Sequence, residues 1–412
     1  MDKIKSKPYT PKLFTPRNAA ESFRQVSRGG ISNGKFWRWG DDNLFPEALA
    51  LMARRSTIHR RILNDKADYI SGKGFNMGDR LPALRTFVEC ANGGGETLRH
   101  ILRKVTFDKL LFGNSFLEVV TDVGKSFLSF YHQDATRCRV SREGKSLILH
   151  HDWSKFREEE AVVLPLYPEF ARGEDGNMHS VLHFKDYEPA FEHYGVPSYI
   201  AGMNVSAIAY KTDRWNISRL DNSFHLSGVM MLDGGVDNEE QAGEIVRLAE
   251  KKFAGTPGQV MFMIKDCEGG DGSRFIPIDS SYEGDWKTLH EQATGDIVVA
   301  HSWFRSLSGL QYSSGFETQR IVHEYEVALN TVILTAQSEL MEPVRAVMED
   351  ILREDCSSLV IVNKPPTRTR PGYMRIWEAR QADGLDFDAE NPQEQMFVAE
   401  LGDASTISKL TN

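Results

Sequence analysis

The chain has 412 residues, 41% of them hydrophobic, and a formal net charge of −9. This length allows two or three domains with a sizeable buried core. The acidic balance excludes a protein that coats nucleic acid by neutralising its phosphates. The sequence also lacks any run approaching the roughly 18 apolar residues that a membrane-spanning helix needs.

The four cysteines lie far apart and show no C-x-x-C spacing. This pattern excludes a zinc site or a disulfide framework and predicts reduced thiols in a cytosolic protein. We therefore expect no metal and no other cofactor. The cysteines are Cys90, Cys138, Cys267 and Cys356.

Residues 1–40 are expected to form a flexible N-terminal arm that is basic at its start. The first seventeen residues contain three prolines, and five basic residues outweigh the one acid there, Asp2. This composition is typical of a solvated tail, and it also suits a docking arm. The basic residues are Lys3, Lys5, Lys7, Lys12 and Arg17.

Residues 41–195 are predicted to form an α+β domain, with helices first and then a small, mostly antiparallel sheet. One amphipathic helix is expected to begin after a cap at Asp42 or Asn43 and to continue to Ile70, just before Gly72.

A second helix of this domain is predicted over about residues 97–111. The sequence then turns into a strand over residues 112–120. Further short strands, separated by turn signals, are predicted at residues 126–131, 137–140, 146–150 and 179–184.

Two long helices are predicted on either side of a small insertion. The first begins at the Y-G-V-P turn (residues 194–197) and ends at about residue 226, and the second covers about residues 286–300. The insertion shows a β-α-β-β pattern, with strands at residues 229–232, 259–264 and 274–278 and a charged helix at residues 238–253.

A Ser/Gly-rich loop over residues 302–315 leads into a long helix. Apolar residues recur there at helical spacing from Ile321 to Ile351. Pro343 lies inside this pattern and predicts a kink at that position. After the helix, the one convincing strand is at residues 358–362.

Two G-K-S tripeptides invite comparison with a phosphate-binding loop. Neither has the preceding glycine that such a loop requires, and each lies between strands instead of opening a helix. We predict hairpin turns at residues 124–126 and 144–146.

Other motifs of catalysis and metal binding are incomplete. His290 and His323 each start an H-E pair that lacks the second histidine of a zinc-protease motif. His150 and His151 stand beside Asp152, but neighbouring side chains on a strand point to opposite faces and cannot easily share an ion. No nucleophile elbow or dinucleotide-binding glycine motif is present. The residues give no support for an enzyme.

Seven short motifs follow one another along residues 41–352. They are D-N-L-F-P (42–46), I-S-G-K-G-F (70–75), L-L-F-G-N-S-F-L-E-V (110–119), Y-H-Q-D-A-T-R-C-R-V (131–140), Y-G-V-P-S-Y-I-A-G (194–202), S-G-V-M (227–230) and E-T-Q-R-I-V (317–322). Each motif alone is weak. Their order, together with the order of the predicted elements, resembles the portal protein family of tailed bacteriophages.

The resemblance implies a structural subunit of a virion that is not an enzyme. Portal subunits form a closed ring, expected here to be a dodecamer, at one capsid vertex. Double-stranded DNA is packaged and ejected through its channel without sequence specificity. The partners implied are the large terminase subunit, a head-completion adaptor, the major capsid protein and a scaffold protein, with no membrane, and assembly takes place in the host cytoplasm.

Carried over element by element, the resemblance implies a portal-like α+β architecture and divides the chain into named parts. The parts are the arm at residues 1–40, a wing at 41–195, stem helices at 196–226 and 280–301, a clip at 227–279, a tunnel loop at 302–316, a long kinked helix at 317–352, and a C-terminal wing or crown segment at 353–412.

The resemblance also implies two functional surfaces. Arg305 in the tunnel loop would form a girdle of positive charge around the DNA, or it would make a surface salt bridge. Acidic residues of the clip would dock the motor and the adaptor, or they would form a solvated helix face. The tunnel-loop candidates are Arg305, Ser306, Leu307, Ser308, Leu310, Gln311 and Tyr312. The clip candidates are Asp237, Glu239, Glu240, Glu244, Asp266, Glu268 and Asp271.

Two other functions remain open at this point. One is a nucleic-acid-processing enzyme of a mobile element, which stoichiometric metal or nucleotide in the purified protein would indicate. The other is a different structural connector protein of a virion. A ring with a central channel would indicate the portal.

Overall fold

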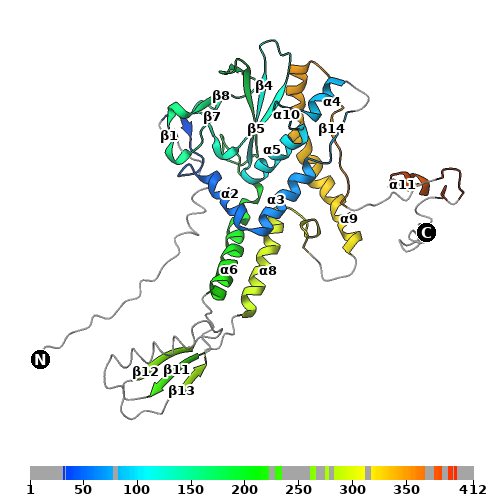
Figure 1. The fold of residues 1–412 in the computed structure, drawn as a ribbon. Coiled ribbons are helices and arrows are strands. Elements are labelled where there is room, and N and C mark those ends of the chain that lie inside the picture. Colours follow the sequence, from blue (N-terminus) through cyan, green and yellow to red (C-terminus); the bar gives the residue numbers. More distant parts are fainter. Residues whose placement is uncertain are drawn as a thin grey trace.

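The computed structural model describes residues 31–32, 34–77, 82–221, 228–233, 260–265, 274–277, 283–310, 317–366, 375–382, 388–392 and 394–396. Over these residues the chain forms a body of mixed helices and sheets, from which a pair of helices extends (Figure 1). The expected mixture of helices with mainly antiparallel sheets is therefore confirmed. None of the described helices is both long and apolar enough to cross a membrane.

The first helical region of the body consists of two helices where one was predicted. α2 (Phe45–Arg55) and α3 (Thr57–Ile70) are separated by Ser56, whose backbone is extended (φ −108°, ψ 113°). The hydroxyl of Ser56 accepts a hydrogen bond from His59 N at 3.4 Å and so caps α3. The single-helix prediction was wrong because the apolar stripe continues across this one-residue break.

Neither residue predicted to cap this region does so. The N-cap of α2 is Leu44, and no side-chain hydrogen bond caps the helix there. Asp42 Oδ1 instead accepts from Leu44 N at 2.9 Å, and the Asn43 side chain binds Arg139, as described below.

The main sheet has the strand order β5-β4-β10-β9 and is antiparallel throughout. Its strands are β4 (Asn114–Thr121), β5 (Ser129–Gln133), β9 (Ala171–Arg172) and β10 (Met178–Lys185). α5 (Leu98–Phe112) leads into β4 through Gly113, which has a φ of 68°. A Cβ at Gly113 would lie 2.5 Å from the carbonyl carbon of Val196, so both the backbone angle and the space require glycine.

A second, three-stranded sheet has the order β6-β7-β8, and β1 and β2 pair beside it. The strands are β6 (Cys138–Val140), β7 (Ser146–Leu149), β8 (Val162–Pro165), β1 (Ile31–Ser32) and β2 (Phe36–Trp37). The two G-K-S tripeptides connect the antiparallel pairs β4–β5 and β6–β7, so the predicted hairpin turns are confirmed.

The remaining helices are α4 (Pro82–Glu89), α6 (Met203–Asp221), α8 (Glu283–Ala300), α9 (Glu317–Ala328), α10 (Leu334–Leu352) and α11 (Ile376–Ala382). Short 3-10 helices are η1 (Ala135–Arg137), η2 (Trp153–Lys155), η3 (Glu158–Glu160), η4 (Ser198–Gly202) and η5 (Ser306–Ser308). The predicted long helix after the Y-G-V-P turn thus starts as the 3-10 helix η4 and continues as α6.

Beyond α6 and α8 in Figure 1 lies a third sheet, with the order β12-β11-β13. Its strands are β11 (Gly228–Asp233), β12 (Val260–Lys265) and β13 (Arg274–Pro277). β11 is parallel to β12, as two strands joined by a crossover are, and antiparallel to β13. These strands agree with the prediction, and the helix predicted between β11 and β12 lies outside the described residues.

Three clusters of buried apolar residues hold the body together. One lies between α4, α5, the main sheet and α10, and a second joins α2 to the second sheet. The third joins α3 to α6, α8 and α9. The C-terminal strand β14 (Val360–Ile361) pairs antiparallel with β3 (Phe75–Asn76), so the chain after α10 returns to the end of α3.

Candidate functional site

The candidate site lies where the helix pair α6 and α8 joins the body. The two helices pack side by side (Figure 1). Gly202 makes their close approach possible, because a Cβ there would lie 2.4 Å from the Cβ of Ala300. The Y-G-V-P-S-Y-I-A-G motif ends on this glycine, which the packing explains.

A buried polar cluster fixes the end of α8 to α3. His59 Nδ1 and His301 Nε2 are 2.7 Å apart, and Lys66 Nζ donates to His301 O at 3.0 Å. Tyr199 stacks on the His301 ring, with centroids 4.8 Å apart, and its hydroxyl donates to Leu111 O at 2.6 Å. The cluster therefore connects α3, α5, η4 and the residue that follows α8.

Burial determines the charges in this cluster. It lowers the pKa of His59 to about 4 and that of His301 to about 2, so both imidazoles are neutral at pH 7. It also lowers the pKa of Lys66 to about 8. Sequence reasoning missed these residues, because no spacing relates His59 and Lys66 to His301.

The chain after α8 folds back on the body over residues 302–310. Ser302 has a positive φ of 48°, and Trp303 N donates to Val298 O at 3.1 Å. Trp303 and Leu307 are buried in the same cluster as residues of α3 and α9. This part of the predicted loop is therefore a packed turn that contains η5.

Glu324 of α9 ties η5 to the long helix. Its Oε2 accepts from the backbone N of Ser306 at 3.2 Å and from the Ser306 hydroxyl at 2.5 Å. Ser308 donates its hydroxyl to Phe304 O at 2.9 Å within the turn. The position of the turn thus depends on α9.

The tunnel-loop candidates do not share one environment. Arg305 is exposed, Ser306 and Leu310 are half-buried, and Leu307 and Ser308 are buried inside the chain. Gln311 and Tyr312 lie outside the described residues. In this part of the chain Arg305 is the candidate whose side chain reaches the surface, while Leu307 and Ser308 support the turn from beneath.

The long helix after the loop changes type at a position that the sequence did not indicate. α9 and α10 are joined by a π-helical turn, η6 (Leu329–Ile333). Pro343, where a kink was predicted, lies within α10, which continues to Leu352. Asn330 Nδ2 and Thr331 Oγ1 donate to the carbonyls four residues earlier at 2.8 and 2.7 Å. The irregularity between α9 and α10 is therefore a π-turn, which does not require a proline.

A cavity of about 400 Å³ adjoins this π-turn. Val332 of the turn lines it, and Lys109 crosses it to bind Asp186 at 3.3 Å and Glu339 at 2.7 Å. Its lining includes Ser198 but no histidine or cysteine. The cavity therefore combines paired charges with apolar walls.

The clip candidates are not among the described residues. Asp237, Glu239, Glu240, Glu244, Asp266, Glu268 and Asp271 all lie in the segments between β11 and β13 that the structure leaves out. Their placement on one acidic surface stays a prediction.

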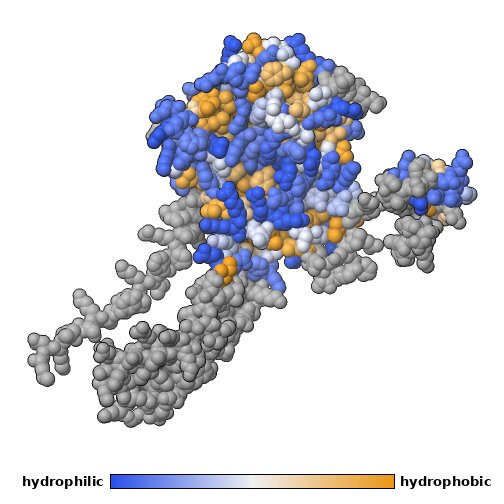
Figure 2. Space-filling model, in the orientation of Figure 1, coloured by the Kyte–Doolittle hydropathy of each residue, from blue (hydrophilic) through white to orange (hydrophobic). Residues whose placement is uncertain are grey.

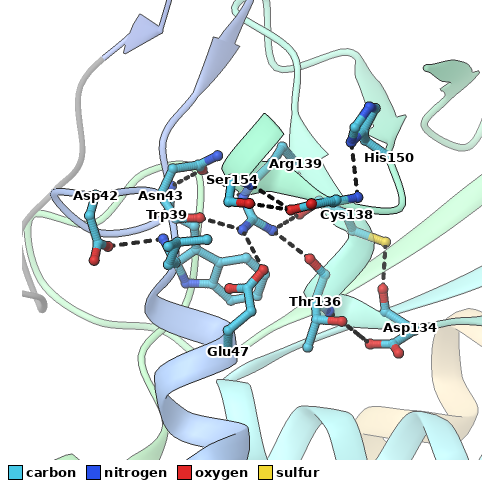
Figure 3. A network of polar contacts seen from close by, with 12 residues as sticks. Trp39, Asp42, Asn43, Glu47, Asp134, Thr136, Cys138, Arg139, His150 and Ser154 are labelled. Carbon is cyan, nitrogen blue, oxygen red and sulfur yellow. Dashed lines mark hydrogen bonds and ion pairs between the residues drawn. The ribbon is translucent and has the colours of Figure 1, made fainter. Parts of the chain in front are cut away.

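Two motifs that carried the resemblance prove to be joined by Arg139 (Figure 3). This β6 residue is fully buried and reaches the segment before α2. Its Nε donates to Asn43 Oδ1 at 2.7 Å and its Nη2 to Asn43 O at 2.6 Å, while Nη1 binds the carbonyls of Thr136 and Cys138 at 3.0 and 2.8 Å. Glu47 Oε1 lies 3.5 Å from Nη2.

Aromatic rings complete this environment. The Arg139 guanidinium lies 5.6 Å from the Trp39 ring centroid and 4.8 Å from that of Trp153. Burial lowers the pKa of Arg139 and raises that of the Glu47 carboxyl. The D-N-L-F-P and R-C-R-V residues therefore stabilise the fold, and nothing in their geometry indicates a binding site.

The histidine pair near this network is arranged differently from the prediction. β7 ends at Leu149, so His150 and His151 follow the strand, and their rings stack with centroids 4.7 Å apart. Glu160 Oε2 lies 3.8 Å from His150 Nε2 and 3.6 Å from His151 Nδ1. The expectation that the two imidazoles point to opposite faces was wrong.

The ligand atoms of His150, His151 and Glu160 lie within 4.8 Å of one another, close enough for these residues to share a metal ion. His150 Nδ1 faces the backbone N–H of Asp152 at 3.1 Å, and its Nε2 faces that of Arg157 at 3.3 Å. A neutral imidazole has a single lone pair, so a metal would compete with these N–H groups for His150.

No family model matches the sequence, and no curated protein matches it. Solved structures do match. A chain in the virion of a native gene transfer agent particle superposes with a TM-score of 0.55 and 15% identity, over 83% of this chain and 94% of that one. A chain in the neck of an empty gene transfer agent particle, computed with C6 symmetry, gives 0.54 and 16%, over 83% and 94%. The fold is shared with chains of a virion neck.

Two further structures extend the comparison. A chain in the neck of the native particle, computed with C12 symmetry, has a TM-score of 0.53 and 14% identity, over 83% of this chain and 95% of that one. An HK97 family phage portal protein from Corynebacterium diphtheriae has a TM-score of 0.41 and 12% identity, over 73% and 89%, which is too low to carry an argument. At the level of the fold, this chain is therefore similar to chains of the virion and neck of gene transfer agent particles.

Proposed function

We propose that this chain is the portal subunit of a tailed phage or prophage. It forms a ring at one vertex of the capsid, and double-stranded DNA enters and leaves through its channel. The observation that carries the proposal is the fold shared over 83% of the chain with chains of particle necks that were computed with C6 and C12 symmetry. A twelve-subunit ring agrees with both symmetries.

We assign the parts of the proposed portal as follows. Residues 41–195 and the C-terminal segment form the wing, with or without a crown, and α6 and α8 are the stem. β11–β13 and the acidic segments between them form the clip, which docks the terminase motor and later the head-completion adaptor. The capsid and scaffold proteins contact the ring from outside. The ring has no enzymatic activity, because the motor is a separate protein.

Arg305 is the proposed contact with DNA. It is the exposed cation of the packed turn after α8, and ring symmetry repeats it once per subunit. A net charge of −9 per chain disfavours tight binding of DNA along the chain as a whole, and fixed phosphate contacts would slow its passage. A single girdle of arginines would therefore hold the DNA without arresting it.

The test is the amount of DNA per particle when an induced prophage carries the variant chain. Arg305→Ala is expected to reduce packaged or retained DNA several-fold while rings still form. Arg85→Ala is the matched control, because Arg85 is an exposed arginine on α4, away from the turn. Wild-type DNA content in the Arg305→Ala particles would contradict this role.

A further inference from the structure

Four arginines gather at the corner between α2 and α3. Arg54 and Arg55 end α2, Arg60 and Arg61 lie near the start of α3, and all four are exposed. Figure 2 shows a strongly hydrophilic band on the visible face where Figure 1 places α2 and α3. The chain as a whole is acidic, so this concentration of positive charge is local.

Most of this charge has no acidic partner among the described residues. Arg61 Nε binds Asp65 Oδ2 at 2.6 Å. Among the described residues, no carboxylate lies within ion-pair distance of Arg54, Arg55 or Arg60. Three positive charges are thus available to a molecule outside the described chain.

Two of these arginines are already held in place by aromatic rings. The guanidinium of Arg55 lies 5.0 Å from the ring centroid of Tyr210, and that of Arg60 lies 4.6 Å from the ring centroid of Phe107. A guanidinium stacked on a ring keeps N–H donors for a carboxylate. It also loses less side-chain entropy on binding than a mobile arginine does. The surface is therefore preorganised.

The position of Arg60 and Arg61 works against local helix stability. The N-terminal end of a helix carries partial positive charge, and α3 has no acidic residue in its first turn. Arg54 and Arg55, in contrast, favour the end of α2.

The apolar part of the corner identifies the kind of partner. Leu51 is 42% exposed and lies one turn before Arg54 and Arg55 on the same side of α2. Arginines held by aromatic rings are typical of the centre of a protein–protein interface, and an exposed leucine on the same helix adds apolar surface. A DNA backbone would use the arginines but would leave the exposed Leu51 without a role. The composition favours a protein.

We propose that this corner is a docking surface for an acidic segment of another protein of the particle. Carboxylates of that segment pair with Arg54, Arg55 and Arg60, and an apolar side chain among them contacts Leu51. The inference rests on the proposed function only in placing the partner in the same particle. It is separate from the channel, the clip and Arg305.

Photo-crosslinking tests this proposal in cells that produce the particle. Leu51 is replaced by p-benzoyl-phenylalanine, and the cross-linked peptide is sequenced by mass spectrometry. The expected product joins Leu51 to a peptide of another protein that contains several Asp or Glu residues. The Arg55→Ala, Arg60→Ala double variant should reduce the yield at least fivefold. Arg60→Lys, which keeps the charge, should reduce it less, and Arg85→Ala should leave it unchanged.

Three outcomes overturn the proposal: a cross-link to DNA, a cross-link to a peptide without carboxylates, or no cross-link in assembled particles. Thermal unfolding of each purified variant tests whether a variant that loses the cross-link is still folded. Electron microscopy of the same protein shows separately whether it forms rings. A chain that fails to form rings but still gives the acid-rich cross-link would contradict the proposed function and not this docking surface.

Discussion

Asn43 and Arg139 show what sequence motifs reveal at the scale of single residues. Both lie in motifs that the sequence singled out, yet no spacing rule relates residues so far apart. Asn43 has a φ of 64°, which asparagine tolerates better than most residues, and its side chain and carbonyl both accept from Arg139. The motifs could be recognised from the sequence, but their contact required the fold.

Replacing Arg139 should destabilise the body strongly. Arg139→Met removes the donors for Asn43 and for two carbonyl oxygens in a fully buried site. We expect a loss of about 3 kcal/mol or more in the free energy of unfolding, measured with urea. Arg137→Met is the control two residues away, and because Arg137 is exposed it should change the value by less than about 0.5 kcal/mol. Equal effects would refute the role of the buried network.

His179 should make stability depend on pH. Its Nδ1 lies 2.7 Å from Glu118 Oε1 and its Nε2 lies 2.9 Å from Asp175 Oδ1. Burial lowers the pKa of His179, but the hydrogen bonds to Asp175 and Glu118 outweigh it, and the pKa is raised above its ordinary value. A raised pKa in the folded state stabilises the fold below about pH 6.5, and this stabilisation is lost as the pH rises through the folded pKa.

The measurement is the free energy of unfolding of the wild type and of His179→Gln across this range. The difference should be largest below about pH 6.5 and should shrink toward pH 8.5. His100→Gln is the control, because His100 is exposed on α5. A difference that grows with pH would show that His179 is not the protonated partner of the two carboxylates.

At the scale of elements, the packing of α6 against α8 should depend on Gly202. In Gly202→Ala the new Cβ would lie 2.4 Å from the Cβ of Ala300, so the helices must separate. We expect a loss of about 1–3 kcal/mol in the free energy of unfolding. Adding Ala300→Gly should recover much of it, because that change removes the opposing atom.

Gly295 provides the contrast within α8. A Cβ there meets no atom within 4 Å, so Gly295→Ala should leave stability unchanged or raise it by up to about 1 kcal/mol. If Gly202→Ala and Gly295→Ala lost the same free energy of unfolding, the contact with Ala300 would not be the cause of the loss at Gly202. That result would contradict this prediction.

The π-turn η6 should tolerate the deletion of one residue. A π-turn contains one residue more than the α-helical path, so deleting Asn330, which is exposed, leaves α9 and α10 in their present orientations. We expect a folded protein with a cooperative thermal transition. Deleting Ser338, exposed within α10, rotates the following buried residues by about 100° and should prevent folding. The reverse result would show that η6 is not an insertion in a regular helix.

The elements themselves could be predicted largely from local patterns. α5, α8 and strands of all three larger sheets lie near their predicted positions, since apolar periodicity and turn residues determine them locally. The break at Ser56 and the π-turn at Leu329–Ile333 could not be predicted, because the apolar stripe continues through both. The kink predicted at Pro343 stays a prediction, because α10 continues through this residue and a continuous helix can still bend there.

At the scale of the whole molecule, the order of elements was more informative than any residue. The motifs were individually weak, but their succession pointed to a fold that the virion-neck structures share at 14–16% identity. The buried cluster of His59, Lys66 and His301 joins distant segments and was invisible in the sequence. The acidic clip residues stay a prediction, as does Arg305 as a DNA contact.

The most direct test of the central claim is cryo-electron microscopy of the purified full-length chain. The account predicts a closed ring, expected to contain twelve copies of the 46.6 kDa subunit, around an open central channel. The turn that carries Arg305 should face that channel in every subunit. A monomer, a dimer or an assembly without a channel, obtained with the scaffold protein present as well as absent, would contradict it.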